Sequence, residues 1–325
     1  MKGLGKDSVG WLTADENTEA QRIDNFLIKL LKGVPRTHVY RLLRTGQVRV
    51  NSHRVDATYR LQIGDRVRVP PVRTGQSSPG RVTATMGEAV VRDLERAILF
   101  EDEHLLVLNK PSGLAVHGGS GISRGVIEEM RRLRPKQRFL ELVHRLDRDT
   151  SGVLLMAKKR SALLALHRHV RNGAMRKFYR LLVRGAWPWA RREVRLPLEK
   201  FLLPGGDRRV KVATDGQMAH TIFVRTELVG PFSLLEAELL TGRTHQIRVH
   251  VAHCGYPIVG DDKYGDFALN KVLARQGLKR MFLHASQVQV SHPASGEVLR
   301  LAAPLAPELS AFLARISKAP SSMED

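Results

Sequence analysis

The chain has 325 residues, enough for about two domains, and 42 % of them are apolar, which fits folded domains and excludes a wholly disordered chain. Its 53 lysines and arginines outnumber its 32 aspartates and glutamates, for a formal net charge of +21. A chain this basic is expected to bind a polyanion, either RNA, DNA or an anionic membrane surface.

Cysteine content and hydropathy narrow the class of protein further. The single cysteine, Cys254, excludes a disulfide framework and a multi-cysteine metal site, and it fits a reducing, cytoplasmic compartment. No apolar run approaches the ~18 residues that cross a bilayer, so we expect no membrane span. The N-terminal residues contain no long apolar stretch, so we expect no secretory signal.

The N-terminal part of the chain predicts a small basic α/β domain. Residues 1–18 are polar and are expected to be a flexible N-terminus. Residues 19–72 form the domain, with two amphipathic helices, the second ending near Gly46, and two short strands with alternating valines. Residues 73–95 are rich in Gly, Ser, Pro and Thr and are interpreted as a linker.

The rest of the chain predicts a larger domain over residues 96–316, followed by a disordered tail over 317–325. Strands outnumber helices and follow one another in hairpins, which favours an α+β fold with a mixed or antiparallel sheet. Residues 98–113 are predicted to form a strand, a turn and a second strand, and further strands are predicted over 177–185, 220–229 and 232–240. The predicted helices cover 161–172, with Ser161 as N-cap, and 246–254.

Arginines gather around the second helix of the basic domain and the turn that follows it. They are Arg36, Arg41, Arg44 and Arg49. Such arginines are often just the solvated faces of ordinary helices. Residues 20–70, however, hold eleven Lys or Arg against three Asp or Glu, and this density favours a phosphate-binding face for RNA.

A dense group of charges occupies the centre of the chain in the sequence HRLDRDTSG, residues 144–152. An apolar approach and a Thr-Ser-Gly turn predict the end of a strand, where functional side chains are often displayed. Asp149 is most simply a turn former. Asp147 is either a buried salt-bridge partner or a catalytic carboxylate, and periodicity does not decide between these roles.

Two sets of motifs resemble known families. VPRTHVYRLLRTGQVRVN and GDRVRVPP resemble the RNA-binding domain named after ribosomal protein S4. HRLDRDTSG resembles the signature of the pseudouridine synthases of the ribosomal large-subunit type, most closely their C-type members. LVLNKPSGLAVH, KFYRLLVRG, TGRTHQIRVH, GYPIVGDDKYG and FLHA occur in the order expected for that family.

The resemblance implies an enzyme that isomerises specific uridines of large-subunit (23S) ribosomal RNA to pseudouridine by base flipping, without a cofactor. It makes Asp147 the catalytic residue, either as a nucleophile at the anomeric carbon or the base ring, or as a base that removes a sugar proton. It assigns support of the active site to Tyr179, Arg248 and Leu283. RNA or pocket contacts are assigned to Arg145, Lys110, Arg243 and His245.

Arg248 is expected to keep the carboxylate charged in a dry pocket, because a neighbouring arginine lowers the pKa of an aspartate. No metal site is expected, since His245, His250 and His253 lack a cluster of carboxylates or cysteines at ligand spacing. Nothing in the sequence calls for more than a monomer.

Two other classes of function were weighed against the enzyme. A non-catalytic RNA-binding or ribosome-assembly factor on the same scaffold is disfavoured because Asp147 is present. A DNA-binding protein that uses the N-terminal helices is disfavoured because it leaves the catalytic motifs without a purpose.

Overall fold

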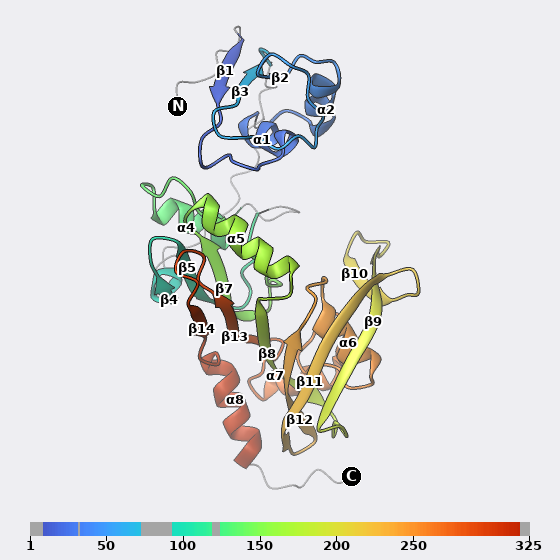
Figure 1. The fold of residues 1–325 in the computed structure, drawn as a ribbon. Coiled ribbons are helices and arrows are strands. Elements are labelled where there is room, and N and C mark those ends of the chain that lie inside the picture. The colour runs from blue at the N-terminus through green and yellow to red at the C-terminus, as the bar shows by residue number, and fades with distance from the viewer. Residues whose placement is uncertain (1–8, 32, 73–92, 119–123, 319–325) are drawn as a thin grey trace. The chain divides into compact units, whose positions relative to one another are not determined.

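The computed structural model describes residues 9–31, 33–72, 93–118 and 124–318 (Figure 1). The chain divides into two compact units. One unit is Met1–Thr85 with Lys159–Ser161, and the other is Met86–Lys158 with Ala162–Asp325. We call them the N-terminal unit and the catalytic unit and describe each by itself.

The N-terminal unit packs two helices against a small sheet. Its elements are β1 (Gly10–Thr13), α1 (Ile23–Leu30), α2 (Arg36–Arg44), β2 (Arg49–Val50) and β3 (Arg66–Val69). Among the described residues the sheet has three antiparallel strands in the order β1-β3-β2. The apolar positions of both helices are buried against the valines of the strands, which confirms the predicted amphipathic helices. Gly46 ends α2 with φ of 69°, as predicted from its place after the helix.

The prediction of a flexible segment over residues 1–18 is wrong for Gly10–Thr13. These residues form β1, which pairs with β3 along its whole length, and Ala14 is buried directly after it. The exposed Trp11 ring lies under the Arg66 guanidinium, 5.1 Å from ring centre to carbon. An edge strand held by backbone hydrogen bonds needs no apolar pattern, so residue types alone do not predict this strand. Residues 1–8 lie outside the described part.

The predicted linker over 73–95 is also wrong at one end. Residues 73–92 lie outside the described part, but residues 93–96 form a helical turn. Leu94 is fully buried in the core of the catalytic unit. One leucine in a polar stretch is too weak a pattern to predict such an anchor.

The catalytic unit is built on a long mixed sheet. Its strands are β4 (Ile98–Glu101), β5 (Leu105–Lys110), β6 (Glu141–Leu142), β7 (Ser151–Ala157), β8 (Arg176–Arg184), β9 (Arg191–Leu202), β10 (Arg208–Val212), β11 (Gln217–Val229), β12 (Phe232–Leu239), β13 (Leu283–Ser291) and β14 (Val298–Ala302). Eleven strands of the described ranges follow the order β10-β9-β11-β12-β8-β13-β7-β5-β4, with β14 beside β13 and β6 beside β7. The β13–β7 pairing is parallel and the others are antiparallel, which confirms the predicted α+β fold with a mixed sheet.

Helices cover parts of this sheet (Figure 1). They are α4 (Val126–Leu133), α5 (Arg160–Arg171), α6 (Gln246–His253), α7 (Phe267–Arg275) and α8 (Pro307–Lys318). α5 begins one residue before the predicted N-cap, Ser161. α8 includes residues 317 and 318, which were predicted to be disordered, because its apolar face packs through Leu309 and Phe312. Residues 319–325 lie outside the described part, and no helix within it is long and apolar enough to cross a membrane.

The middle of the sheet is buried on both faces. Alternate residues of β5 and β7 belong to two different apolar clusters, and all seven residues of β7 are buried. Gly152, at φ of 111°, lets β7 approach β13 closely, since a Cβ there would lie 2.1 Å from the Ala285 carbonyl oxygen. The loop that carries Asp147 therefore leads directly into a strand that is buried on both faces of the sheet.

Candidate active site

The loop that carries Asp147 is held by its backbone. The Thr150 N–H donates to the Asp147 carbonyl (3.2 Å), and the Gly113 N–H donates to the Arg148 carbonyl (2.9 Å). The Ser112 hydroxyl donates to the Asp149 carbonyl (2.8 Å). These bonds fix the loop from both sides and leave the Asp147 side chain, 19 % exposed, pointing into a pocket.

Lys110 supports this same loop. Its side chain is fully buried, and its ammonium donates to the carbonyls of Pro111 and Leu114 (2.8 Å each) and of Arg148 (3.0 Å). Burial lowers the pKa of Lys110 to about 7. The prediction of Lys110 as an RNA contact is therefore wrong, because the turn that follows it closes over the ammonium group.

The pocket beside Asp147, which we call the target pocket, has a volume of about 250 Å³. Distant parts of the sequence meet there: the Asp147 loop, β8, α6 with the turn before it, and the start of β13. Seven of the predicted site residues line it, namely Asp147, Tyr179, Arg248, Leu283, Arg145, Arg243 and His245. The structure thus brings together every predicted residue of the catalytic unit except Lys110.

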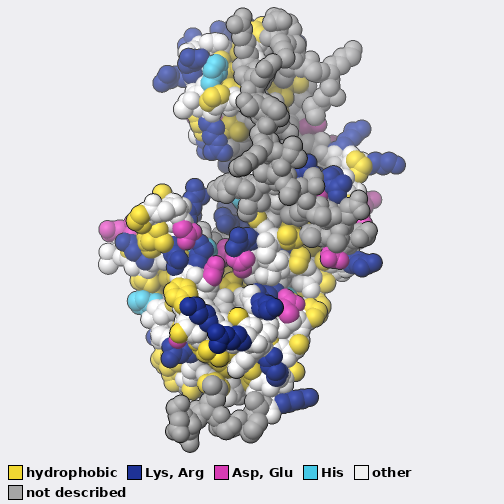
Figure 2. Space-filling view, turned by 180° about the vertical axis from the view of Figure 1, so that it is seen from behind, with side chains coloured by type: hydrophobic (Ala, Val, Ile, Leu, Met, Phe, Trp, Pro, Cys, Tyr) yellow, Lys and Arg dark blue, Asp and Glu magenta, His cyan; other side chains and the backbone are white. Residues whose placement is uncertain are grey.

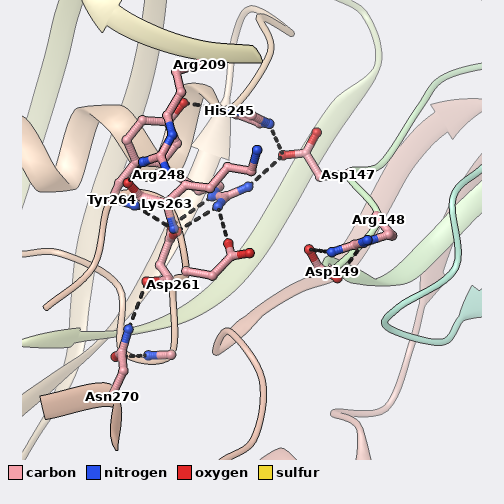
Figure 3. Close-up of polar contacts among 12 residues, drawn as sticks. Asp147, Arg148, Asp149, Arg209, His245, Arg248, Asp261, Lys263, Tyr264 and Asn270 are labelled. Atoms are coloured by element: carbon pink, nitrogen blue, oxygen red, sulfur yellow. Dashed lines mark hydrogen bonds and ion pairs between the residues drawn. The ribbon is translucent and has the colours of Figure 1, made fainter. Parts of the chain in front are cut away.

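Asp147 and Asp149 differ in what their carboxylates contact (Figure 3). Asp149 pairs with its neighbour Arg148, with Nε to Oδ1 at 3.1 Å. Within the described residues, no hydrogen bond reaches the carboxylate oxygens of Asp147. Its ion-pair contacts are longer than hydrogen bonds, to Arg248 Nη1 (3.8 Å) and His245 Nε2 (3.9 Å), so its lone pairs are free for a ligand.

Arg248 is buried and shared between three carboxylates. It is 3 % exposed, and its Nε and Nη2 donate to Asp261 (2.7 and 2.6 Å), with Asp262 at 3.2 Å. Burial opposes the charge of Asp261, but the hydrogen bonds from Arg248 outweigh it and lower the pKa of Asp261. In return, burial would lower the pKa of Arg248, yet the surrounding carboxylates raise it. Asp261 thus fixes a permanent cation beside Asp147.

His245 is oriented by a tyrosine that the sequence reasoning missed. Its Nδ1 lies 2.8 Å from the Tyr264 hydroxyl, whose oxygen accepts a hydrogen bond from Val210 N–H (2.8 Å). The Tyr264 hydroxyl and His245 Nδ1 share one hydrogen bond, whose direction depends on the tautomer of His245, and Nε2 faces Asp147. Burial lowers the pKa of His245 and favours its neutral form. His245 takes a left-handed φ of 54°, a strained conformation typical of functional sites.

Tyr179 and Leu283 form an apolar wall of the target pocket. Both side chains are buried, Tyr179 within β8 and Leu283 at the start of β13. Burial raises the pKa of Tyr179, and the charge of Asp147 raises it further, so the hydroxyl stays protonated. A flat ring and a branched alkyl group suit the face of a nucleobase.

Arg145 and Arg243 stand at the mouth of the pocket and are exposed. Arg243 Nε donates to the Met218 carbonyl (3.2 Å). His144, next to Arg145, points inward and its Nε2 accepts the Leu155 N–H (3.2 Å). Burial lowers the pKa of His144 to about 4, so it is a neutral structural residue. The described residues contain no group of three or more His, Cys, Asp or Glu that is arranged to hold a metal ion.

The predicted cations of the N-terminal unit lie on its surface, and lysine and arginine side chains project from this unit in Figure 2. Arg36, Arg41, Arg44 and Arg49 are all exposed. Arg41 and Arg44 line a shallow surface pocket together with Tyr40 and Arg54. Arg49 also braces the turn after α2, since its guanidinium donates to the Gly46 and Ser52 carbonyls.

The chain is similar to known proteins over both of its units. Residues 104–253 match the family described as RNA pseudouridylate synthase, and residues 21–67 match the S4 domain. The chain is 50 % identical to the ribosomal large subunit pseudouridine synthase C of Pasteurella multocida, over 97 % of this chain and 96 % of that protein. It is also 50 % identical to the protein of the same name from Escherichia coli K12, over 95 % of this chain and 96 % of that protein.

A solved structure shares the fold over most of the chain. The human RNA pseudouridylate synthase domain containing 4 superposes with a TM-score of 0.58 at 27 % identity, over 71 % of this chain and 96 % of that chain.

Proposed function

The chain belongs to the RNA pseudouridylate synthase family, and we propose that it isomerises specific uridines of large-subunit (23S) ribosomal RNA at the target pocket. It is an RNA pseudouridine synthase with an S4 RNA-binding domain. The choice of large-subunit RNA rests on the names of relatives that are 50 % identical over nearly the whole chain. The observation that carries the proposal is an uncommitted carboxylate, Asp147, at the wall of a pocket lined by Tyr179 and Leu283.

The reaction defines what the pocket must do. In pseudouridine formation the N1–C1′ bond of uridine breaks, a C5–C1′ bond forms, the C5 proton leaves and N1 gains a proton. Nothing is oxidised or reduced and no group is transferred, so the chain's own residues suffice. They must hold the detached base, act at the sugar–base bond and exchange one proton.

Asp147 is proposed as the group that acts at the sugar–base bond. Its oxygens are free, and the fixed cation of Arg248 and the imidazole Nε2 of His245 lie 3.8 and 3.9 Å away. Charges held in place before the reaction stabilise charge that develops during it, because they need no reorganisation. Attack at C1′, attack at the base ring and removal of a sugar proton all fit this position of Asp147.

The remaining residues are proposed to present the base. A uridine inside folded RNA must be flipped out of its stack, which costs a few kcal/mol. Tyr179 and Leu283 receive the ring, and the exposed guanidinium of Arg145 at the pocket mouth fills the space that the uridine leaves. Arg243 is placed to contact the RNA backbone beside the same opening.

The N-terminal unit is proposed to hold the RNA through its exposed arginines, as S4 domains bind RNA. We further propose that the chain acts as a monomer, because one chain alone supplies the whole lining of the target pocket. Ribosomal RNA as the substrate also supports a cytoplasmic location.

The test is to map pseudouridine in 23S ribosomal RNA from cells with and without this protein, by chemical labelling. A small set of uridines is expected to lose the modification and to regain it when the protein is restored. An unchanged map would contradict the proposed substrate, and a change confined to another RNA would replace it.

A further inference from the structure

A second pocket, which we call the neighbour pocket, adjoins the target pocket and has no role in the mechanism above. Its volume is about 420 Å³, larger than that of the target pocket. The two pockets share one wall, made of Arg145 and residues 242–244. The other walls come from β9, β10 and the turn between β10 and β11. An RNA chain that places one base beside Asp147 therefore passes directly over a second cavity.

The floor of the neighbour pocket is apolar. Leu198 and Val210 line it and are 5 % and 4 % exposed. The Val210 N–H bonds to Tyr264, the residue that orients His245. The floor is thus a fixed apolar surface of the kind on which the flat face of a base can pack.

The rim carries free charges of both signs. Lys200 and Asp215 line the pocket and are exposed, and no ion pair of either side chain occurs within the described ranges. Glu199, which also lines the pocket, is by contrast paired with Lys211 (3.5 Å). A ligand that satisfies both free charges must offer an anionic group and N–H donors at once.

A tight turn holds the acidic side of the rim in place. The Gly216 N–H donates to the Ala213 carbonyl (2.9 Å), and the Ala213 N–H donates to the Pro197 carbonyl of β9 (3.1 Å). Gly216 lies so close to β9 that a Cβ would stand 2.6 Å from the Leu198 carbonyl carbon. Asp215 and Gln217, on either side of Gly216, are therefore fixed along one edge of the pocket.

From this arrangement we infer that the neighbour pocket binds the nucleotide next to the target uridine and selects guanine there. The inference rests on the proposed function, since it needs RNA as the substrate. The base packs on Leu198 and Val210, and the phosphate meets Lys200. The Asp215 carboxylate only accepts hydrogen bonds, and guanine presents two adjacent N–H donors on its Watson–Crick edge, whereas uracil presents one between two carbonyls.

The experiment uses the full chain and synthetic RNA stem-loops cut from 23S RNA around each mapped uridine, with tritium at C5 of that uridine. Release of tritium measures the reaction. In one set of RNAs, the nucleotide on either side of the target is replaced by an abasic ribose, and in another set a guanine neighbour is replaced by uracil. For the wild-type protein, replacement on one side is expected to raise KM about tenfold, the effect of losing hydrogen bonds to a charged group.

Two variants connect this effect to the pocket. Lys200→Ala is expected to raise KM by up to about tenfold for the intact RNA and by a similar factor for the abasic RNA, because the abasic ribose keeps the phosphate that Lys200 contacts. Asp215→Asn is expected to remove the preference for guanine over uracil. Arg208→Ala is the matched control, since Arg208 is an exposed cation of the same hairpin that does not line the pocket.

The outcomes separate the two proposals. If wild-type protein releases no tritium from any large-subunit RNA, the proposed function fails. If it does release tritium but tolerates abasic sites on both sides, or if Lys200→Ala behaves like Arg208→Ala, the neighbour pocket does not bind a nucleotide. A guanine preference that survives in Asp215→Asn would overturn the role of that carboxylate.

Discussion

The two units of this protein place their charges in opposite ways. In the N-terminal unit the arginines that are proposed to contact RNA lie on the surface, as Arg36, Arg41 and Arg44 do. In the catalytic unit the cation next to Asp147 is buried and fixed, since Arg248 is 3 % exposed and bound to Asp261. Exposed cations attract RNA over a distance and are screened by salt, whereas buried pairs are screened little. We therefore expect variants of the N-terminal unit to change mainly RNA affinity, and variants around Asp147 to change mainly the rate of the reaction.

The largest effect is expected from Arg248→Met. The change removes the fixed cation 3.8 Å from Asp147, so kcat should fall by about 100-fold or more, which is typical when a preorganised electrostatic group is lost. RNA affinity should stay within about twofold, because the side chain is buried. Single-turnover tritium release and a filter-binding titration measure the two quantities.

Arg243→Met is the matched control for that variant, since Arg243 is an exposed arginine at the mouth of the same pocket. It should weaken RNA binding more than turnover. If Arg248→Met kept its rate and lost affinity instead, Arg248 would be an RNA contact.

An intermediate effect concerns stability in acid. Two fully buried histidines of the catalytic unit, His250 and His284, have their pKa lowered to about 4 by burial, from an ordinary 6.5. Between these values the unfolded chain binds more protons than the folded chain, so stability is complete above pH 6.5 and is lost as the pH falls toward 4. Each histidine should cost about 2 kcal/mol at pH 5 relative to pH 8.

Urea unfolding of the catalytic unit at pH 8 and pH 5, followed by hydrogen exchange of its peptides, measures this loss. In His284→Gln the difference between the two pH values should shrink. A pH dependence that is unchanged in this variant would show that His284 titrates normally in the folded chain. His53, an exposed histidine of the N-terminal unit, provides the control substitution.

The smallest effect is expected from the surface of the N-terminal unit. Replacing Arg36, Arg41 and Arg44 together by Gln should weaken RNA binding by about tenfold near physiological salt and reduce the slope of log K against log salt by about 2. The rate at saturating RNA should not change. An unchanged salt slope would mean that these arginines do not face phosphates.

The helices and the mixed sheet could be predicted from the sequence. Most residues of the target pocket could also be predicted, because the motifs around Asp147, Tyr179 and Arg248 closely resemble those of the pseudouridine synthases. Sequence reasoning missed what depends on burial and on long-range pairing. From the sequence, Lys110 is a plausible phosphate contact. In the structure its ammonium group is buried and donates to three backbone carbonyls. Asp261 and Tyr264 follow the motif that contains Arg248, but nothing local shows that they hold Arg248 and His245 in place.

The edges of the units show the same limit. β1 is held to β3 by backbone pairing with an exposed Trp11, and such an edge strand leaves no apolar alternation to find. Leu94 was missed for a similar reason, since a single apolar residue forms no helical or strand pattern in the sequence.

The central claim, that the free carboxylate of Asp147 performs the chemistry, is tested most directly by Asp147→Asn beside Asp149→Asn. Asp149 is a matched control two residues away whose carboxylate is already paired with Arg148. Asp147→Asn is predicted to release no tritium from C5 of uridine while binding RNA with the wild-type affinity and salt slope, and Asp149→Asn is predicted to remain active. Sustained turnover by Asp147→Asn would contradict the account.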